Sequence, residues 1–282
     1  MKLCRYGKAG YEKPGMIDAD GRVRDLSKVV ENIGPNEISP RGLKMLSKVK
    51  PQTLPLVNGH PRLGVPYVGI GKFVAIGLNY SDHAKEAGLP IPPEPVVFMK
   101  ATTCISGPND DVVQPRNSTK LDWEIELGVV IGTQAKYVSE ASALEHVAGY
   151  CIVNDVSERA FQMATSQWDK GKGFDTAGPI GPWLVTTDEI RDPQTLDMRL
   201  EVNGKRMQSG NTRTMVFNVA KIIAHVSQYM TLLPGDIITT GTPPGVGLGV
   251  KPTPVFLKPG DVMTLAIQGL GEQKQKVVAH SA

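Results

Sequence analysis

The sequence predicts an α+β fold rich in β-strands, with a small N-terminal β unit before a rolled or sandwiched β-sheet. The 282 residues include 30 glycines and 22 prolines, which mark many tight turns between short strands. Pro-Gly-Asp occurs at 234–236 and again at 259–261, each time before an apolar strand. Pro and Gly at the two central positions favour a type II turn. Two such turns favour a rolled or sandwiched sheet over a solenoid.

Residues 1–70 are predicted to form the small N-terminal β domain, and residues 71–282 the larger domain. Residues 1–7, MKLCRYG, have the pattern of a strand. Residues 15–27 read as a hairpin that turns on Asp18–Gly21. The glycine- and valine-rich segment Val65–Gly71 is interpreted as the connection between the two domains.

Strands dominate the prediction for the larger domain. Lys72–Gly77 is short and apolar, which indicates a buried strand, and Tyr150–Val156 has the same character. In Asp122–Gly132 every second residue is apolar, so that one face of its strand would carry Trp123, Ile125, Leu127, Val129 and Ile131.

Helices are predicted to be few. Phe217–Met230 has the clearest helical pattern, with Val219, Ile222, Ile223, Val226 and Met230 on one face. Ser139–Val147 is a short helix candidate, with a capping box from Ser142 to Glu145 and Gly149 after its end. Asn79–Gly88 is predicted to be a helical turn or a loop.

Composition excludes several classes of protein. The apolar fraction of 40% and the charged fraction of 21% are those of a soluble globular protein. The net charge of +3 comes without a basic stripe, which argues against nucleic-acid binding. No apolar run reaches the roughly 18 residues of a membrane helix, and residues 1–15 lack the core of a signal peptide. Three scattered cysteines, Cys4, Cys104 and Cys151, suit small buried hydrophobes in the reducing cytoplasm.

Three acidic residues form a candidate metal site. Glu124 and Glu126 lie two apart in a strand pattern, so their side chains leave one face with Cα atoms about 6.6 Å apart. Burying two like charges is costly, and a divalent cation would offset that cost. Asp155 ends another predicted buried strand. Because all three donors are oxygens, Mg²⁺ or Mn²⁺ is favoured, Ca²⁺ is a third candidate and Zn²⁺ is disfavoured. Spacing alone also fits a solvated strand face, so both interpretations stay open.

Several segments together resemble one known family. They are DWEIELGVVIG (122–132), GYCIVNDVSERAFQ (149–162), the Trp168 and Lys172 pair, FDTAGPIGPWLVT (174–186) and PGDIITTGTPPGVG (234–247). In this order they resemble the catalytic domain of the fumarylacetoacetate hydrolase family over about residues 70 to 270. Residues 1–27 resemble its short bacterial members. Many of these are called ureidoglycolate lyases, and some cleave 2,4-diketo-3-deoxy sugar acids.

The resemblance implies a mixed β-sandwich roll around one metal site, in a homodimer. It places the metal on Glu124, Glu126 and Asp155. It also matches His83 and Glu86 to a catalytic pair on a segment that orders into a lid. Gln162 matches a substrate-orienting glutamine, and Lys172 a lysine that stabilises an enolate. The longer members of the family carry a further acidic ligand, but Val74–Tyr80 contains no acid. Water would fill that position here.

The local pattern gives these residues both a functional and an ordinary reading. His83 and Glu86 are three apart, so a helical turn would face them the same way, and the carboxylate would make the imidazole a better base. The alternative is an exposed surface pair. Lys170 is expected to be solvated, whereas Lys172 would face the metal. Gln162 has an alternative as an ordinary polar residue.

Other residues are weaker candidates for substrate binding. The turn at Gly241 and Thr242 follows an apolar strand, and backbone N–H groups in such a turn can bind a carboxylate. Its alternative is a turn that needs glycine for its backbone angles. Arg159, Lys100 and Tyr80 are candidates for the lining of the site, each with a surface or packing role as its alternative.

These features predict a hydrolase that cleaves the carbon–carbon bond of a 2,4-dioxo acid, such as an acylpyruvate, to pyruvate and a second acid. The rival on the same scaffold is a lyase or decarboxylase acting on ureidoglycolate or oxaloacetate, which needs no attacking water. A rival of another class is a non-catalytic metal-binding or interaction module. The partner expected in every enzymatic case is a small 2-oxo acid.

Overall fold

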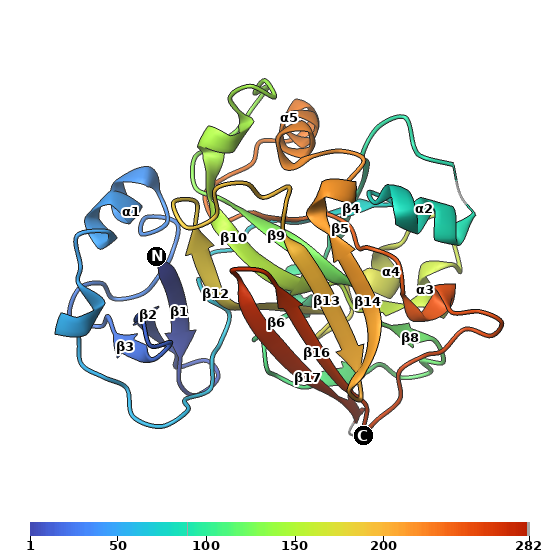
Figure 1. Cartoon of the computed structure of the whole chain (residues 1–282), viewed down its shortest axis with the longest axis horizontal. Helices are drawn as coiled ribbons and strands as arrows, with labels where there is room; N and C mark the ends of the chain where they lie inside the picture. The colour runs from blue at the N-terminus through green and yellow to red at the C-terminus, as the bar shows by residue number, and fades with distance from the viewer. Residues whose placement is uncertain (89, 281–282) are drawn as a thin grey trace.

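Two large β-sheets face each other in this computed structural model, which describes residues 1–88 and 90–280 (Figure 1). Their strands are β1 Lys2–Tyr6, β2 Lys13–Ile17, β3 Val23–Asp25, β4 Phe73–Gly77, β5 Val96–Lys100, β6 Ile105–Ser106, β7 Val112–Gln114, β8 Leu121–Asp122, β9 Ile125–Ile131, β10 Val147–Asn154, β11 Ser157–Glu158, β12 Gly178–Thr186, β13 Asp197–Val202, β14 Lys205–Asn211, β15 Ile237–Thr239, β16 Val262–Ile267 and β17 Gly271–Ala279. The predicted β-rich, mixed sandwich roll is confirmed.

The larger sheet runs in the order β3-β2-β1-β12-β10-β9-β15-β4-β5, and β6 pairs with β12 beside this path. Neighbours are antiparallel except for the β15–β4 and β12–β6 pairs. Its middle strands are buried on both faces, because β9 and β10 contain only buried residues. The second sheet has the order β14-β13-β16-β17-β7, and β8 and β11 form a separate pair.

Polar side chains join the two large sheets across an otherwise apolar core. Gln273, in β17, donates hydrogen bonds from its Nε2 to the carbonyl oxygens of Ile152 at 2.8 Å and Gly181 at 3.0 Å. Asn154, at the end of β10, donates to Gln275 Oε1 at 3.1 Å. These groups are buried and satisfied, so they fix how the sheets sit on each other.

The N-terminal hairpin forms as predicted. β1 pairs with β2 and β2 with β3, and Gly21 takes a φ of 77° where the chain reverses after Asp18. β1 also pairs with β12, through Leu3 and Leu184. The first strands therefore extend the edge of the larger sheet, on the left of Figure 1. The division at residue 70 stays a prediction.

The helices are short. They are α1 Pro40–Leu46, α2 Ser81–Ala87, α3 Arg159–Gln162, α4 Asp169–Lys172 and α5 Val219–Tyr229, with 3₁₀ turns η1 Pro51–Thr53, η2 Thr102–Cys104, η3 Ala143–His146, η4 Thr212–Thr214 and η5 Gly247–Gly249. None of those in the described residues is long and apolar enough to cross a membrane. The helix predicted over Phe217–Met230 is α5, which begins at the Asn218 cap and buries Val219, Ile222, Ile223 and Val226.

Two local predictions are wrong. Asp122–Gly132 is not one strand, because the chain leaves β8 after Asp122 and enters β9 at Ile125. Alternation failed as a guide because both faces of β9 are buried. The helix predicted over Ser139–Val147 is only the 3₁₀ turn η3, and Val147 already belongs to β10. Ser142 makes no side-chain cap there.

Both Pro-Gly-Asp segments form the predicted turns, but their aspartates differ in burial. Gly235 and Gly260 have φ values of 95° and 99°, as the third position of a type II turn requires. Asp236 is 1% exposed, accepts the N–H groups of Lys72 at 2.8 Å and Leu233 at 2.7 Å, and pairs with Lys72 Nζ. It ties the turn before β15 to the start of β4. Asp261 makes its hydrogen bonds at the surface.

Asp236→Ala is therefore expected to destabilise the protein much more than Asp261→Ala. The first change leaves two part-buried N–H groups without their charged acceptor, at a cost of about 2–3 kcal/mol in the free energy of unfolding. The second, at the surface, costs less than about 1 kcal/mol. Urea unfolding of both variants with unchanged m-values measures the difference. Equal losses would contradict this role for Asp236.

Candidate active site

Three buried carboxylates converge where β9 and β10 lie side by side. Glu126 is in β9, Glu124 lies in the gap between β8 and β9, and Asp155 directly follows β10. The Asp155 N–H donates to the Glu124 carbonyl oxygen at 2.9 Å, which joins two of the three backbones directly. The three residues are at most 6% exposed, and one oxygen from each lies within 4.8 Å of the others.

Cations neutralise two of these acids and leave the third alone. Lys172 Nζ donates to Glu124 Oε2 and Asp155 Oδ2, both at 2.7 Å. Arg159 pairs with Glu124 at 2.6 Å, and Lys100 with Asp155 at 2.6 Å. Glu126 forms no ion pair with any described residue. Its Oε2 accepts hydrogen bonds from Thr239 Oγ1 and the Gly241 N–H.

The pKa values follow this asymmetry. Burial alone would raise the pKa of Glu124, but the charges of Lys172 and Arg159 hold it well below its ordinary range. Burial and the charges of Asp155 and Glu124 raise the pKa of Glu126 well above its ordinary value. A divalent cation beside Glu126 would remove that penalty, and the donors are all oxygens, so the residues fit such an ion.

Two candidate lining residues lie in the core instead. Lys100 is 2% exposed, and its ammonium is held by Asp155 and by the carbonyl oxygens of Lys172 and Ala177. Tyr80 is fully buried, and its hydroxyl donates to Met198 Sδ at 3.1 Å. Neither lines a cavity at the site, because each side chain satisfies its polar group inside the protein.

Asp122 belongs to the site, although it was not predicted from the sequence. Its fully buried carboxylate accepts Arg159 Nε at 2.8 Å and the N–H groups of Gly247 at 2.6 Å and Leu248 at 3.0 Å. Arg159 is thereby fixed against Glu124, and the loop at Gly247 is fixed against both. The sequence did contain a signal for it, because Asp122 lies between two apolar residues and two positions before Glu124.

His83 and Glu86 lie on the same side of α2, as their spacing predicts. His83 Nδ1 and Glu86 Oε2 are 3.1 Å apart. Glu86 also accepts the Gly245 N–H at 3.0 Å. Burial raises the pKa of Glu86, but these hydrogen bonds and the charges of His83 and Lys251 bring it below its ordinary value. The imidazole therefore has an ionised carboxylate beside it, an arrangement that suits a general base.

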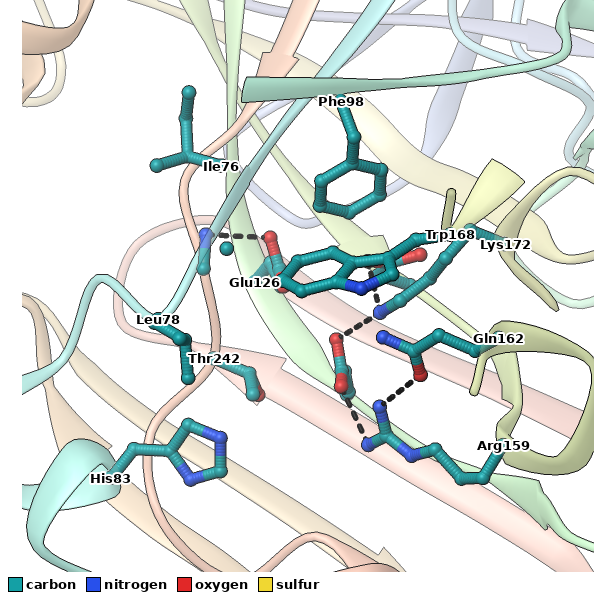
Figure 2. A pocket seen from close by; sticks show the side chains of 14 residues that line it. Ile76, Leu78, His83, Phe98, Glu126, Arg159, Gln162, Trp168, Lys172 and Thr242 are labelled. Atoms are coloured by element: carbon teal, nitrogen blue, oxygen red, sulfur yellow. Dashed lines mark hydrogen bonds and ion pairs between the residues drawn. The ribbon is translucent and has the colours of Figure 1, made fainter. Parts of the chain in front are cut away.

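The site opens into two joined cavities. The inner one, of about 70 Å³, is lined by the three acids together with Lys172, Gln162, His83 and Thr242. Figure 2 shows His83 and Gln162 on opposite sides of it, with Trp168 across its face. The outer cavity, of about 600 Å³, shares Leu78, His83, Arg159, Gln162 and Trp168 with the inner one.

The end of β4 is shaped to admit Trp168. A Cβ on Gly77 would lie 2.5 Å from the Trp168 ring, so only glycine permits this contact. Leu78, the next residue, has a φ of 53°, a backbone angle that residues other than glycine rarely adopt. Phe98 packs edge-on against Trp168 at 5.3 Å between ring centroids. From the sequence, Trp168 was identified only as part of a motif, and Gly77, Leu78 and Phe98 were not identified as site residues.

The turn at Gly241 and Thr242 differs from its prediction. The Gly241 N–H, expected to be open to a carboxylate ligand, is used by Glu126 at 2.7 Å. Thr242 Oγ1 donates to the Ile125 carbonyl oxygen and accepts from Gln208 Nε2. The turn lines the inner cavity and holds Glu126, because its donors are committed to the neighbouring strand.

Comparison with known proteins identifies the family. The model of the fumarylacetoacetate (FAA) hydrolase C-terminal domain matches residues 72–278. The chain belongs to the fumarylacetoacetate hydrolase family. A protein of Burkholderia lata, provisionally named a hydrolase, is 62% identical, with 98% of each chain covered. A fumarylacetoacetate hydrolase structure from Exiguobacterium antarcticum is 38% identical, with a TM-score of 0.89 over 99% of this chain and all of that one.

The solved members of the family include more than one activity. Maleylpyruvate hydrolase from Sphingobium sp. SYK-6, in complex with manganese(II) and pyruvate, is 30% identical, with a TM-score of 0.83 and full coverage of both chains. A 5-carboxymethyl-2-hydroxymuconate delta-isomerase from Mycobacterium smegmatis is 32% identical, with a TM-score of 0.78 and full coverage of both chains. Membership therefore supports an enzyme of the hydrolase or isomerase kind.

Proposed function

We propose that this family member hydrolyses the C3–C4 bond of a 2,4-dioxo acid, giving pyruvate and a second acid. The observation that supports it best is one small cavity between a candidate base and the cluster of three acids and their cationic partners. His83, backed by Glu86, lines it on one side, and Lys172 lines it among the acids. Decarboxylation and isomerisation need no attacking water. A base that lines this cavity favours hydrolysis, because it can remove a proton from an attacking water.

Glu124, Glu126 and Asp155 would hold a divalent cation, with Mg²⁺ or Mn²⁺ favoured by their oxygen donors. Bound there, the cation would act as a Lewis acid toward the oxygens of the 2-oxo acid group. The Asp122–Arg159 pair and Lys100 would keep Glu124 and Asp155 in place. The manganese(II) and pyruvate in the Sphingobium hydrolase support this assignment.

The chain's own residues account for the remaining steps. Glu86 accepts the Nδ1 proton of His83, so the lone pair of Nε2 is available to remove a proton from water. The water oxygen adds to C4, the C3–C4 bond breaks, and its electron pair passes to the enolate of pyruvate. Lys172, 2.7 Å from two acid oxygens, places an ammonium near that developing charge. The proton held by His83 then goes to C3.

The reaction is tested in ¹⁸O-labelled water with a panel of 2,4-dioxo acids and Mg²⁺ or Mn²⁺. Hydrolysis places label in the carboxylate of the second acid, beyond any exchange of the substrate ketones, and releases pyruvate. Carbon dioxide with pyruvate from oxaloacetate alone, or urea with glyoxylate from ureidoglycolate, would support the lyase alternative. An isomerised product without cleavage would support the isomerase.

A further prediction concerns α2, which carries His83 and Glu86. The helix is formed in the structure and is held to the rest of the site by Glu86 and the Gly245 N–H. If it acts as a lid, binding of a 2-oxo acid should slow amide hydrogen exchange in α2. α5, which does not line either cavity, serves as the internal control and should not change. Equal exchange in α2 with and without ligand would contradict a lid.

A further inference from the structure

The orientation of the His83–Glu86 pair depends on one backbone group outside α2. Among residues 1–88 and 90–280, only His83 and Gly245 form hydrogen bonds with the Glu86 carboxylate. The Gly245 N–H lies 3.0 Å and 3.2 Å from its two oxygens. A Cβ on Gly249 would lie 3.0 Å from the same carboxylate, so this loop packs directly against it. Because Glu86 orients the imidazole, the position of the loop decides where the base points.

Two consecutive buried residues hold this loop. Trp123 Nε1 donates to the Gly245 carbonyl oxygen at 3.0 Å. Asp122 accepts the Gly247 N–H on Oδ1 at 2.6 Å and the Leu248 N–H on Oδ2 at 3.0 Å. A Cβ on Gly247 would lie 2.7 Å from Asp122 Oδ1, so only glycine lets the loop come this close. The loop over 245–248 is therefore fixed to the segment that joins β8 to β9.

The same segment carries a candidate metal ligand. Glu124 directly follows Asp122 and Trp123 in the sequence. Asp122 Oδ2 also accepts Arg159 Nε at 2.8 Å, and Arg159 Nη2 pairs with Glu124 at 2.6 Å. One buried carboxylate is thus bonded both to the loop that fixes Glu86 and to the cation that fixes Glu124. The candidate base and the candidate metal site are positioned from a single point.

We propose that Asp122 is a positioning residue for the His83–Glu86 pair. With Trp123 it holds the loop over 245–248 so that the Gly245 N–H fixes Glu86, and Glu86 aims the imidazole into the inner cavity. The catalytic part of this inference rests on the proposed function, in which His83 is the base. A carboxylate suits the position because all four groups that it accepts, the N–H groups of Trp123, Gly247 and Leu248 and Nε of Arg159, are donors.

Asp122→Asn tests the positioning without turnover. Each carboxylate oxygen holds one N–H group of the loop, so an amide in either orientation turns its NH₂ group toward Gly247 or Leu248. Amide hydrogen exchange in α2, measured on the full chain with Mg²⁺ and without substrate, should become about tenfold faster. Exchange in α5 should not change. Trp123→Phe, which keeps an aromatic ring but removes the indole N–H, should also speed exchange in α2, and it tests the loop if Asp122→Asn does not fold.

Kinetics test whether Asp122 acts through Glu86. At saturating Mg²⁺, with the 2,4-dioxo acid that turns over fastest, Asp122→Asn should lower kcat by about tenfold and leave KM within about twofold. In a Glu86→Gln background the same change should lower kcat by less than about twofold, because the group through which Asp122 acts is already lost. An undiminished loss in that background would mean that Asp122 acts only through Arg159 on Glu124, and would overturn the proposal.

Asp236→Asn is the matched control, because Asp236 is also a buried carboxylate that accepts two backbone N–H groups and pairs with one cation, and it lines neither cavity. It should destabilise the protein but leave kcat and exchange in α2 unchanged. Equally fast exchange in α2 for Asp236→Asn, or unchanged exchange in both Asp122→Asn and Trp123→Phe, would overturn the proposal. If α2 responds as expected while no 2,4-dioxo acid is cleaved, the proposed function fails and the positioning of the pair by Asp122 stands.

Discussion

Glu126→Gln is expected to lower the affinity for Mg²⁺ or Mn²⁺ by at least about a hundredfold and to abolish turnover. Loss of a residue that only supports a metal ligand typically costs 10–100-fold in affinity, and loss of a ligand should cost more. Glu126 is also the one acid of the three without a cationic partner among the described residues. A calorimetric titration with the metal measures the affinity.

The same variant should make the metal-free protein more stable at neutral pH. Glu126 is buried beside two acids, so folding at neutral pH requires either an unfavourable buried charge or the uptake of a proton, and glutamine removes that cost. Asp155→Asn is the matched comparison and should do the opposite, because it leaves the ammonium groups of Lys100 and Lys172 without a shared carboxylate. Thermal unfolding of both variants, first in chelator and then with metal, measures these opposite effects on stability. Equal destabilisation by both variants would contradict the charge distribution inferred here.

The raised pKa of Glu126 also gives metal binding a pH dependence. The folded protein holds the Glu126 proton more tightly than the unfolded chain, so metal-free stability falls as pH rises from the ordinary carboxyl pKa toward the raised one. A metal ion must displace that proton. Affinity should therefore fall as pH is lowered through the raised pKa of Glu126, while Glu124, whose pKa is held low, stays ionised. Metal titrations at several pH values test this.

The sequence predicted the acids of the site better than their surroundings. Glu124, Glu126 and Asp155 could be named as candidates because carboxylates within apolar strands need a compensating charge, and the family resemblance decided for a metal site over a solvated strand face. Which cations supply it could not be selected, because lysine and arginine are usually exposed, and nothing local marks Lys100 as buried. The convergence itself depends on the register in which β9 pairs with β10, and the pattern of neither strand reveals that register.

The cavity walls could not be predicted for a related reason. Besides the three acids, they come from segments scattered along the chain: the end of β4, α2, Phe98 in β5, the α3–α4 region and the loop at Gly241–Pro254. Such segments have no hydrophobic period that reveals which side chains face inward. The break at Glu124 was missed because apolar residues on both faces of β9 resemble one continuous strand.

Lys172→Met is expected to lower kcat by about 10²–10³, the usual cost of removing one electrostatic contact to a developing charge. Methionine keeps the length and apolar stem of lysine but removes the ammonium that lies 2.7 Å from both Glu124 and Asp155. His83→Gln should have an effect of similar size, since it removes the base while leaving α2 formed. Single-turnover rates at saturating metal and substrate measure the chemical step apart from metal loss.

Lys170→Met is the control for Lys172→Met, because Lys170 lies on the same short helix, is exposed and lines neither cavity. It should leave kcat unchanged. The two active-site variants should also be nearly non-additive, because water activation and enolate stabilisation serve one bond-breaking step. A double variant no slower than either single variant supports that joint action. Normal turnover in His83→Gln with loss only in Lys172→Met would instead indicate a reaction without an attacking water, as in decarboxylation.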